Sequence, residues 1–188
     1  MDGMENGGRK DTMKIANERK LRGSDVLLRM LALIATLIAI IIVNVSEETE
    51  LVPVIIAPGL PPLHVPATAK WKYSSAFVYF LVVNAIACAY AVVSLILSML
   101  KLAGTDGIAM VVFVFDLIMA ALLFSGNGAA GAMGVVAYRG NEHVRWEKVC
   151  YIFEKYCRYN TAAGAVSLVG ATAFLVLVIL TALHLRKR

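Results

Sequence analysis

Residues 108–124 read IAMVVFVFDLIMAALLF, an apolar run interrupted by one carboxylate, Asp116. A second run, VLLRMLALIATLIAIIIVNV over residues 26–45, is interrupted in the same way by Arg29. A charge inside a bilayer costs at least about 2.5–3.5 kcal/mol on insertion scales, so it normally faces a partner or a polar cavity. Two opposite charges in separate spans therefore predict an intramembrane ion pair between Arg29 and Asp116.

Two further segments, residues 74–100 and 161–185, are long and apolar. Each exceeds the about 20 residues that a helix rising 1.5 Å per residue needs to cross a hydrocarbon core of about 30 Å. Only 16% of the chain is charged, against roughly 25% in soluble domains. We therefore predict an all-α membrane protein, a four-transmembrane-helix bundle over residues 25–185, with spans at about 26–45, 74–100, 107–137 and 161–185.

The flanking charges predict the topology. Residues 1–24 carry six basic side chains, and the chain ends in three more at residues 186–188. With Lys101 of the second loop these make ten basic residues on one side, against seven in the other two loops. The positive-inside rule then puts both termini in the cytoplasm. Residues 1–24 are rich in glycine at their start, mixed in charge and poor in large apolar side chains, so we expect a disordered basic tail.

The third loop contains two cysteines, Cys150 and Cys157, which this topology places outside the cytoplasm. A disulfide persists in that compartment, and so small a ring adds about 2.5 kcal/mol in the chain-entropy model. The alternative is two free thiols, because Trp146, Val149 and Phe153 share a helical stripe with both cysteines. An unbroken helix would hold the two Cα atoms about 10 Å apart. A helix that ends near Phe153 and turns back satisfies both patterns.

The first loop, residues 46–73, contains all five prolines of the chain. Proline removes a backbone donor and fixes φ, so this loop is predicted to be extended or rich in turns rather than helical. Trp71 and Tyr73 then stand where the chain re-enters the bilayer, as expected of an aromatic belt.

Side chains near the predicted pair decide whether it is tolerated. Arg29 lies about 5 Å and Asp116 about 12 Å into their spans, both in the cytoplasmic half. Asn84 or Tyr90 of the second span could supply the extra hydrogen bonds that a buried ion pair needs. The alternatives are that Arg29 snorkels to lipid phosphates and that Asp116 is neutral, because desolvation favours the uncharged acid. Even a formed pair is expected to fix helix register rather than to carry out chemistry.

On these residues the chain resembles the Casparian strip membrane domain-like (CASP-like) proteins of plants, a four-span family related to the MARVEL group, and within it the first CASP-like subgroup. Three features carry the resemblance: the charged pair Arg29 and Asp116, the stretch AKWKYSSAFVYFLVVNAIACAY at residues 69–90, and the pattern Trp146-x3-Cys150-x2-Phe153-x3-Cys157.

The resemblance implies a plasma-membrane protein with cytoplasmic termini that forms homo-oligomers and hetero-oligomers with related four-span proteins. Founding members of the family build immobile scaffolds that direct cell-wall modification, so cell-wall-modifying proteins are expected partners beside the lipid bilayer. The proline-rich residues 52–66 do not resemble the short loop signature of the true Casparian strip members. The expected function is a non-catalytic membrane scaffold.

Other classes of function find little support. The three histidines, His64, His143 and His184, fall on opposite sides of the membrane. The sequence has no metal-ligand spacing, no nucleophile with a base and no phosphate-binding loop, so no catalytic, cofactor or metal site is expected. Basic residues at membrane edges do not indicate nucleic-acid binding. The rival is a small proton- or ion-coupled transporter or channel subunit that uses Asp116.

Overall fold

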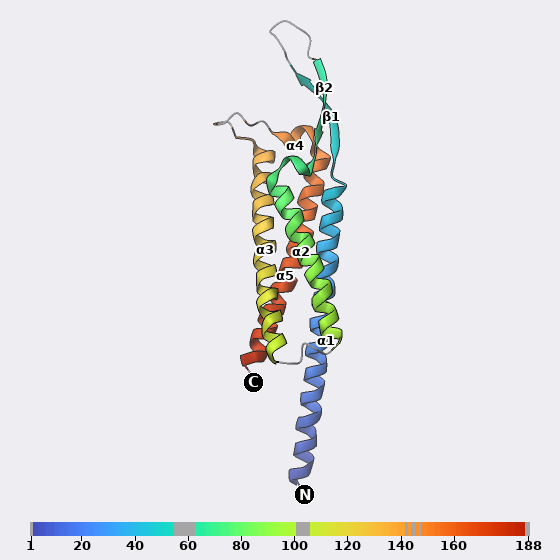
Figure 1. Cartoon of the computed structure of the whole chain (residues 1–188), viewed down its shortest axis with the longest axis vertical. Coiled ribbons are helices and arrows are strands. Elements are labelled where there is room, and N and C mark those ends of the chain that lie inside the picture. The colour runs from blue at the N-terminus through green and yellow to red at the C-terminus, as the bar shows by residue number, and fades with distance from the viewer. Residues whose placement is uncertain are drawn as a thin grey trace.

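The computed structural model describes residues 2–54, 63–100, 106–141, 143, 146 and 148–186. Long helices stand side by side as a bundle (Figure 1): α1 Asp2–Asn44, α2 Ser75–Met99, α3 Asp106–Arg139 and α5 Glu154–Arg186. Within them four segments are long and apolar enough to cross a membrane: Gly23–Asn44, Ser75–Met99, Gly107–Arg139 and Glu154–His184. The predicted four-span membrane fold is confirmed, and both ends of the chain lie at one end of the bundle.

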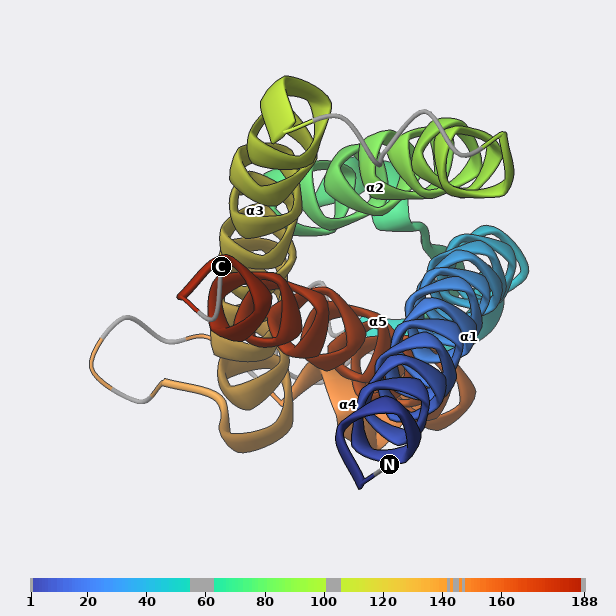
Figure 2. The ribbon, with the colours of Figure 1, turned by 90° about the horizontal axis from the view of Figure 1, so that it is seen from below.

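The helices follow one another around a square (Figure 2). Each packs mainly against two neighbours, so that α1 and α3 stand on one diagonal and α2 and α5 on the other. Small buried side chains such as Ala32, Ala87 and Ala171 line the centre beside the fully buried Phe174. Small residues let helix backbones approach closely in lipid, where packing rather than hydrophobicity drives association.

Two helix starts differ from the sequence-based expectation. Helix α1 begins at Asp2, whereas residues 1–24 were expected to be disordered. Extending a formed helix adds one hydrogen bond per residue and needs no new nucleus, so a stable span favours helix in the polar residues before it. Helix α5 begins at Glu154 rather than at residue 161, because its first turns are polar and the hydropathy pattern does not detect them.

A two-stranded ribbon rises from the end of the bundle opposite the termini (Figure 1). Strand β1 (Glu48–Val54) pairs antiparallel with β2 (Leu63–Ala69), and the short helix η1 (Trp71–Tyr73) leads into α2. Pro66 is paired with Leu51, and Pro53 is paired with His64. Hydrogen-bonded and non-hydrogen-bonded pairs alternate along an antiparallel ladder. These two pairs are two positions apart, so both are of the same type. Non-hydrogen-bonded pairs point their backbone N–H groups away from the partner strand and can therefore hold proline. The extended loop predicted from sequence is thus a hairpin; its prolines 58, 61 and 62 lie outside the described residues.

Candidate functional site

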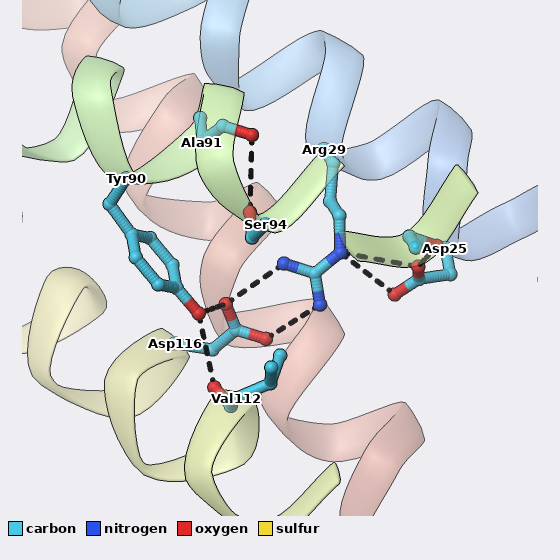
Figure 3. A network of polar contacts seen from close by, with 8 residues as sticks. Asp25, Arg29, Tyr90, Ala91, Ser94, Val112 and Asp116 are labelled. Atoms are coloured by element: carbon cyan, nitrogen blue, oxygen red, sulfur yellow. Dashed lines mark hydrogen bonds and ion pairs between the residues drawn. The ribbon is translucent and has the colours of Figure 1, made fainter. Parts of the chain in front are cut away.

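Arg29 and Asp116 meet inside the bundle (Figure 3). Arg29 Nη1 donates to Asp116 Oδ1 at 3.1 Å, and Nη2 donates to Oδ2 at 3.0 Å. The exposed fraction of the side chain is 3% for Arg29 and 0% for Asp116. Two parallel charge-assisted hydrogen bonds are the strongest arrangement available to this pair. The structure therefore joins α1 to α3 across the diagonal of the bundle.

Tyr90 of α2 completes the surroundings of Asp116. Its hydroxyl lies 2.7 Å from Asp116 Oδ1 and 3.2 Å from the carbonyl oxygen of Val112, so its single hydrogen has two acceptors within reach. The tyrosine ring packs against Phe115 of α3 and Phe174 of α5, with ring centroids 5.9 Å apart in each case. Tyr90 thus supplies the additional hydrogen bond that a buried ion pair requires, and it brings α2 and α5 to the site.

Asp25 is a member of this site that the sequence analysis did not single out. Arg29 Nε lies 3.2 Å from both carboxylate oxygens of Asp25, and Ser98 Oγ of α2 donates to Asp25 Oδ2 at 2.7 Å. The available signal was spacing, because side chains four residues apart lie on the same helix face. Arg29 therefore stands between two carboxylates, and the charged cluster of Asp25, Arg29 and Asp116 is formally one negative charge in excess.

Asn84 belongs to a different set of hydrogen bonds, so the structure corrects the hypothesis that it could support the charged pair. Asn84 Oδ1 accepts from Ser167 Oγ of α5 at 2.9 Å, and Ser167 Oγ accepts from Asn127 Nδ2 of α3 at 2.9 Å. Asn84 and Tyr90 differ in depth by about 9 Å along α2. The bundle therefore has two polar layers: the charged cluster near the termini and a neutral amide layer closer to the hairpin.

The third loop contains a disulfide between Cys150 and Cys157, with 5.6 Å between the two Cα atoms. Helix α4 (Val149–Ile152) is followed by Phe153, whose φ of −111° and ψ of 64° are not helical. This break changes the chain direction, and α5 then begins at Glu154. The helical stripe and the disulfide are therefore both present, because one non-helical residue separates the two helices.

The first two turns of α5 are bonded to the first loop. Glu48 Oε2 accepts from the backbone N–H of Tyr156 at 2.7 Å, and Asn160 Nδ2 donates to Ser46 Oγ at 3.3 Å. Backbone N–H groups in the first helical turn have no intrahelical acceptor, and a carboxylate there also meets the positive end of the helix dipole. Sequence showed several glutamates near residue 48 but could not say which one reaches α5.

The hydrogen bonds within the charged cluster limit the reactions that its side chains can take part in. Both oxygens of Asp116 and all three nitrogens of Arg29 take part in the hydrogen bonds described above. Among the described residues, no group of three or more His, Cys, Asp or Glu side chains could hold a metal ion. The arrangement suits a structural role, in which the ion pair fixes the position of α1 relative to α3 along the bundle axis.

A family model for the Casparian strip membrane protein domain matches residues 18–175. The chain belongs to the Casparian strip membrane protein family. The matched stretch includes the charged cluster, Tyr90 and both disulfide cysteines. The resemblance seen in the sequence is therefore confirmed.

Relatives in this family are similar over almost their full length. CASP-like protein 1E2 of Glycine max is 48% identical over 188 residues, covering 100% of both chains. CASP-like protein 1E1 of the same plant is 50% identical over 164 residues, 87% of each chain. CASP-like protein 1E1 of Arabidopsis thaliana is 42% identical over 180 residues, 93% of this chain and 95% of that protein. No solved structure matches the chain.

Proposed function

We propose that this protein is a non-catalytic scaffold of the plasma membrane that oligomerises, with itself and with related four-span proteins, to organise a membrane domain. The proposal rests on one observation: the charged side chains of Asp25, Arg29 and Asp116 are bonded to one another inside a single bundle. Because Asp116 is fully buried and both its oxygens accept hydrogen bonds from Arg29 or Tyr90, it is held in place rather than presented to a pathway.

The outside of the bundle suits lateral association. Large apolar side chains such as Leu27, Val93 and Ile179 are exposed around the helices, where they meet lipid or a neighbouring protein. With the intramembrane charges bonded internally, this surface can be shared by different partners without breaking the fold. Assembly in the membrane plane therefore needs no rearrangement of the charged cluster.

Orientation forms part of the proposal. The disulfide favours an extracytosolic third loop, and the excess of basic residues near the termini favours a cytoplasmic location for both ends. The hairpin of β1 and β2 then extends toward the cell wall, where cell-wall-modifying proteins are the proposed partners. A cysteine placed at residue 65 should react with a membrane-impermeant thiol reagent on intact cells, and one placed at residue 14 should not.

A transport function has one observation in its favour. The charged cluster is formally one negative charge in excess, which would attract a proton or cation. Proteoliposomes that contain the wild-type protein should show no ion or proton flux above that of empty liposomes. Flux that is abolished by Asp116→Asn would establish the transporter and overturn the scaffold.

The scaffold itself is tested in plant cells with a fluorescent fusion of the full chain. Photobleached patches at the plasma membrane should recover far more slowly than those of an unrelated four-span protein. Chemical crosslinking in native membranes should give a ladder of oligomers. Fast recovery together with a monomer after crosslinking would contradict the proposal.

A further inference from the structure

Helix α4 lies at the hairpin end of the bundle, and one residue, Phe153, separates it from the start of α5 (Figure 1). Phe153 has a φ of −111° and a ψ of 64°, whereas the residues on both sides of it are helical. Residues 149–158 contain neither proline nor glycine, the two residues that most strongly interrupt a helix. The local sequence is therefore also compatible with one continuous helix, so another feature of the molecule holds the break.

The disulfide accounts for the break. A helix rises 1.5 Å per residue, so an unbroken helix would place the Cα atoms of Cys150 and Cys157 about 10 Å apart. A disulfide cannot bridge Cα atoms that are more than about 7 Å apart, and in the structure these two lie 5.6 Å apart. Packing holds α4 only weakly, because Val149 is 42% exposed and Tyr151 is 90% exposed. Without the bridge, α4 is free to join α5.

The backbone N–H of Tyr156 has a different acceptor in each arrangement. In the structure it donates to Glu48 Oε2 at 2.7 Å, which ties the start of β1 to α5. In a continuous helix each N–H donates to the carbonyl oxygen four residues earlier, and for Tyr156 that oxygen belongs to Ile152. The N–H groups of Glu154 and Lys155 gain acceptors in α4 in the same way. Joining the two helices therefore takes the Tyr156 hydrogen away from Glu48.

The disulfide lies within reach of a small reductant. Cys150 and Cys157 are both half-buried, and both line a groove of about 610 Å³ between α3 and α5. Thiol–disulfide exchange begins when a thiolate attacks one sulfur and forms a mixed disulfide. A second thiol then releases the protein. The two cysteines gain two electrons and two protons, and the reductant leaves as its own disulfide.

We propose that the disulfide between Cys150 and Cys157 is a redox switch that controls the attachment of the hairpin to α5. In the oxidised protein it keeps α4 separate from α5 and leaves the Tyr156 N–H to Glu48. Reduction by a small thiol on the hairpin side of the membrane lets α4 and α5 join, and β1 loses its carboxylate contact. The proposal goes beyond the scaffold function and does not rest on it.

The test measures hydrogen exchange at single amides of the full-length protein in lipid nanodiscs, before and after reduction with dithiothreitol. The amides of Glu154 and Lys155 should exchange about fivefold more slowly after reduction, because each gains a hydrogen bond. The amides of β1 should exchange faster, and reoxidation should reverse both changes. Faster exchange at Glu154 and Lys155 in the reduced protein would overturn the proposal, because the two helices would then have loosened rather than joined.

A substitution at residue 154 separates helix joining from reduction itself. Proline is favoured at the first position of a helix and disfavours a helical conformation in the residue before it, which here is Phe153. Glu154→Pro should therefore keep the exchange of β1 at its oxidised value after reduction. Glu154→Ala is the matched control, because it removes the same carboxylate, keeps the backbone N–H and should respond like the wild-type protein. Identical responses of β1 in the two variants would contradict the switch.

The double variant of Cys150→Ser and Cys157→Ser removes the bridge without a reductant. It should show the exchange pattern of the reduced protein and should not change when dithiothreitol is added, since Cys88 is already a free thiol. The pattern of the oxidised protein in this variant, or a response of the variant to dithiothreitol, would overturn the proposal.

Discussion

Arg29 and Asp116, 87 residues apart in the chain, form a bidentate ion pair between two helices that face each other across the bundle. A neighbouring helix pair could be held by packing alone, whereas a diagonal pair has little direct surface in common. The ion pair therefore fixes the height of α1 against α3. Breaking such a buried pair by removing one partner is costly, because the other charge stays behind without compensation.

Tyr90→Phe should destabilise the protein while leaving its ring packing intact. The change removes the hydroxyl that bonds Asp116 at 2.7 Å, and a hydrogen bond to a charged group contributes about 1.5–3 kcal/mol. Equilibrium unfolding in mixed detergent micelles would measure the loss. Tyr79→Phe is the matched control, since the hydroxyl of Tyr79 bonds Ser125 at an exposed position. Equal losses in the two variants would show that Asp116 does not depend on Tyr90.

Removing the disulfide should lower stability by about 2.5 kcal/mol through loop entropy. Cys150→Ser and Cys157→Ser should each have this effect, and the double variant should have no larger one. Cys88 is free and half-buried, so Cys88→Ser serves as the control. Digestion without reductant should yield a linked peptide that contains both cysteines. Complete alkylation of Cys150 and Cys157 without reductant would contradict the bridge.

Glu48→Ala should loosen the attachment of the hairpin to α5. The substitution removes the carboxylate that accepts from the Tyr156 backbone N–H at 2.7 Å. A carboxylate at a helix N-terminus also contributes about 0.3–1 kcal/mol through the helix dipole. Hydrogen exchange should show faster exchange at Tyr156 and in β1. Glu50→Ala, at an exposed position of the same strand, should leave both unchanged. Unaltered protection of Tyr156 in Glu48→Ala would mean that another group caps this helix.

The spans and the charged pair could be predicted from sequence because both follow from the cost of polarity in lipid. Asp25 was missed because it stands at the edge of its span, where a carboxylate costs little and hydropathy does not mark it. Its spacing of four residues from Arg29 was the only signal in the sequence. The choice between Asn84 and Tyr90 as support for the pair stayed open, because hydrogen bonding depends on the rotation of each helix as well as on depth. Whether the third loop forms one helical stripe or a disulfide depended on one non-helical residue, Phe153. The register of the hairpin depended on pairing between residues distant in sequence.

The double-mutant cycle of Arg29→Leu and Asp116→Leu, measured as the free energy of unfolding in micelles, tests the central claim most directly. Arg29→Leu should cost about 3–5 kcal/mol and should exceed the loss in Asp116→Leu, because Arg29 retains Asp25 as a partner in the second variant. The double variant should lose clearly less than the sum of the two. Strictly additive losses would show that the two charges act independently, and that α1 and α3 are not locked by this pair.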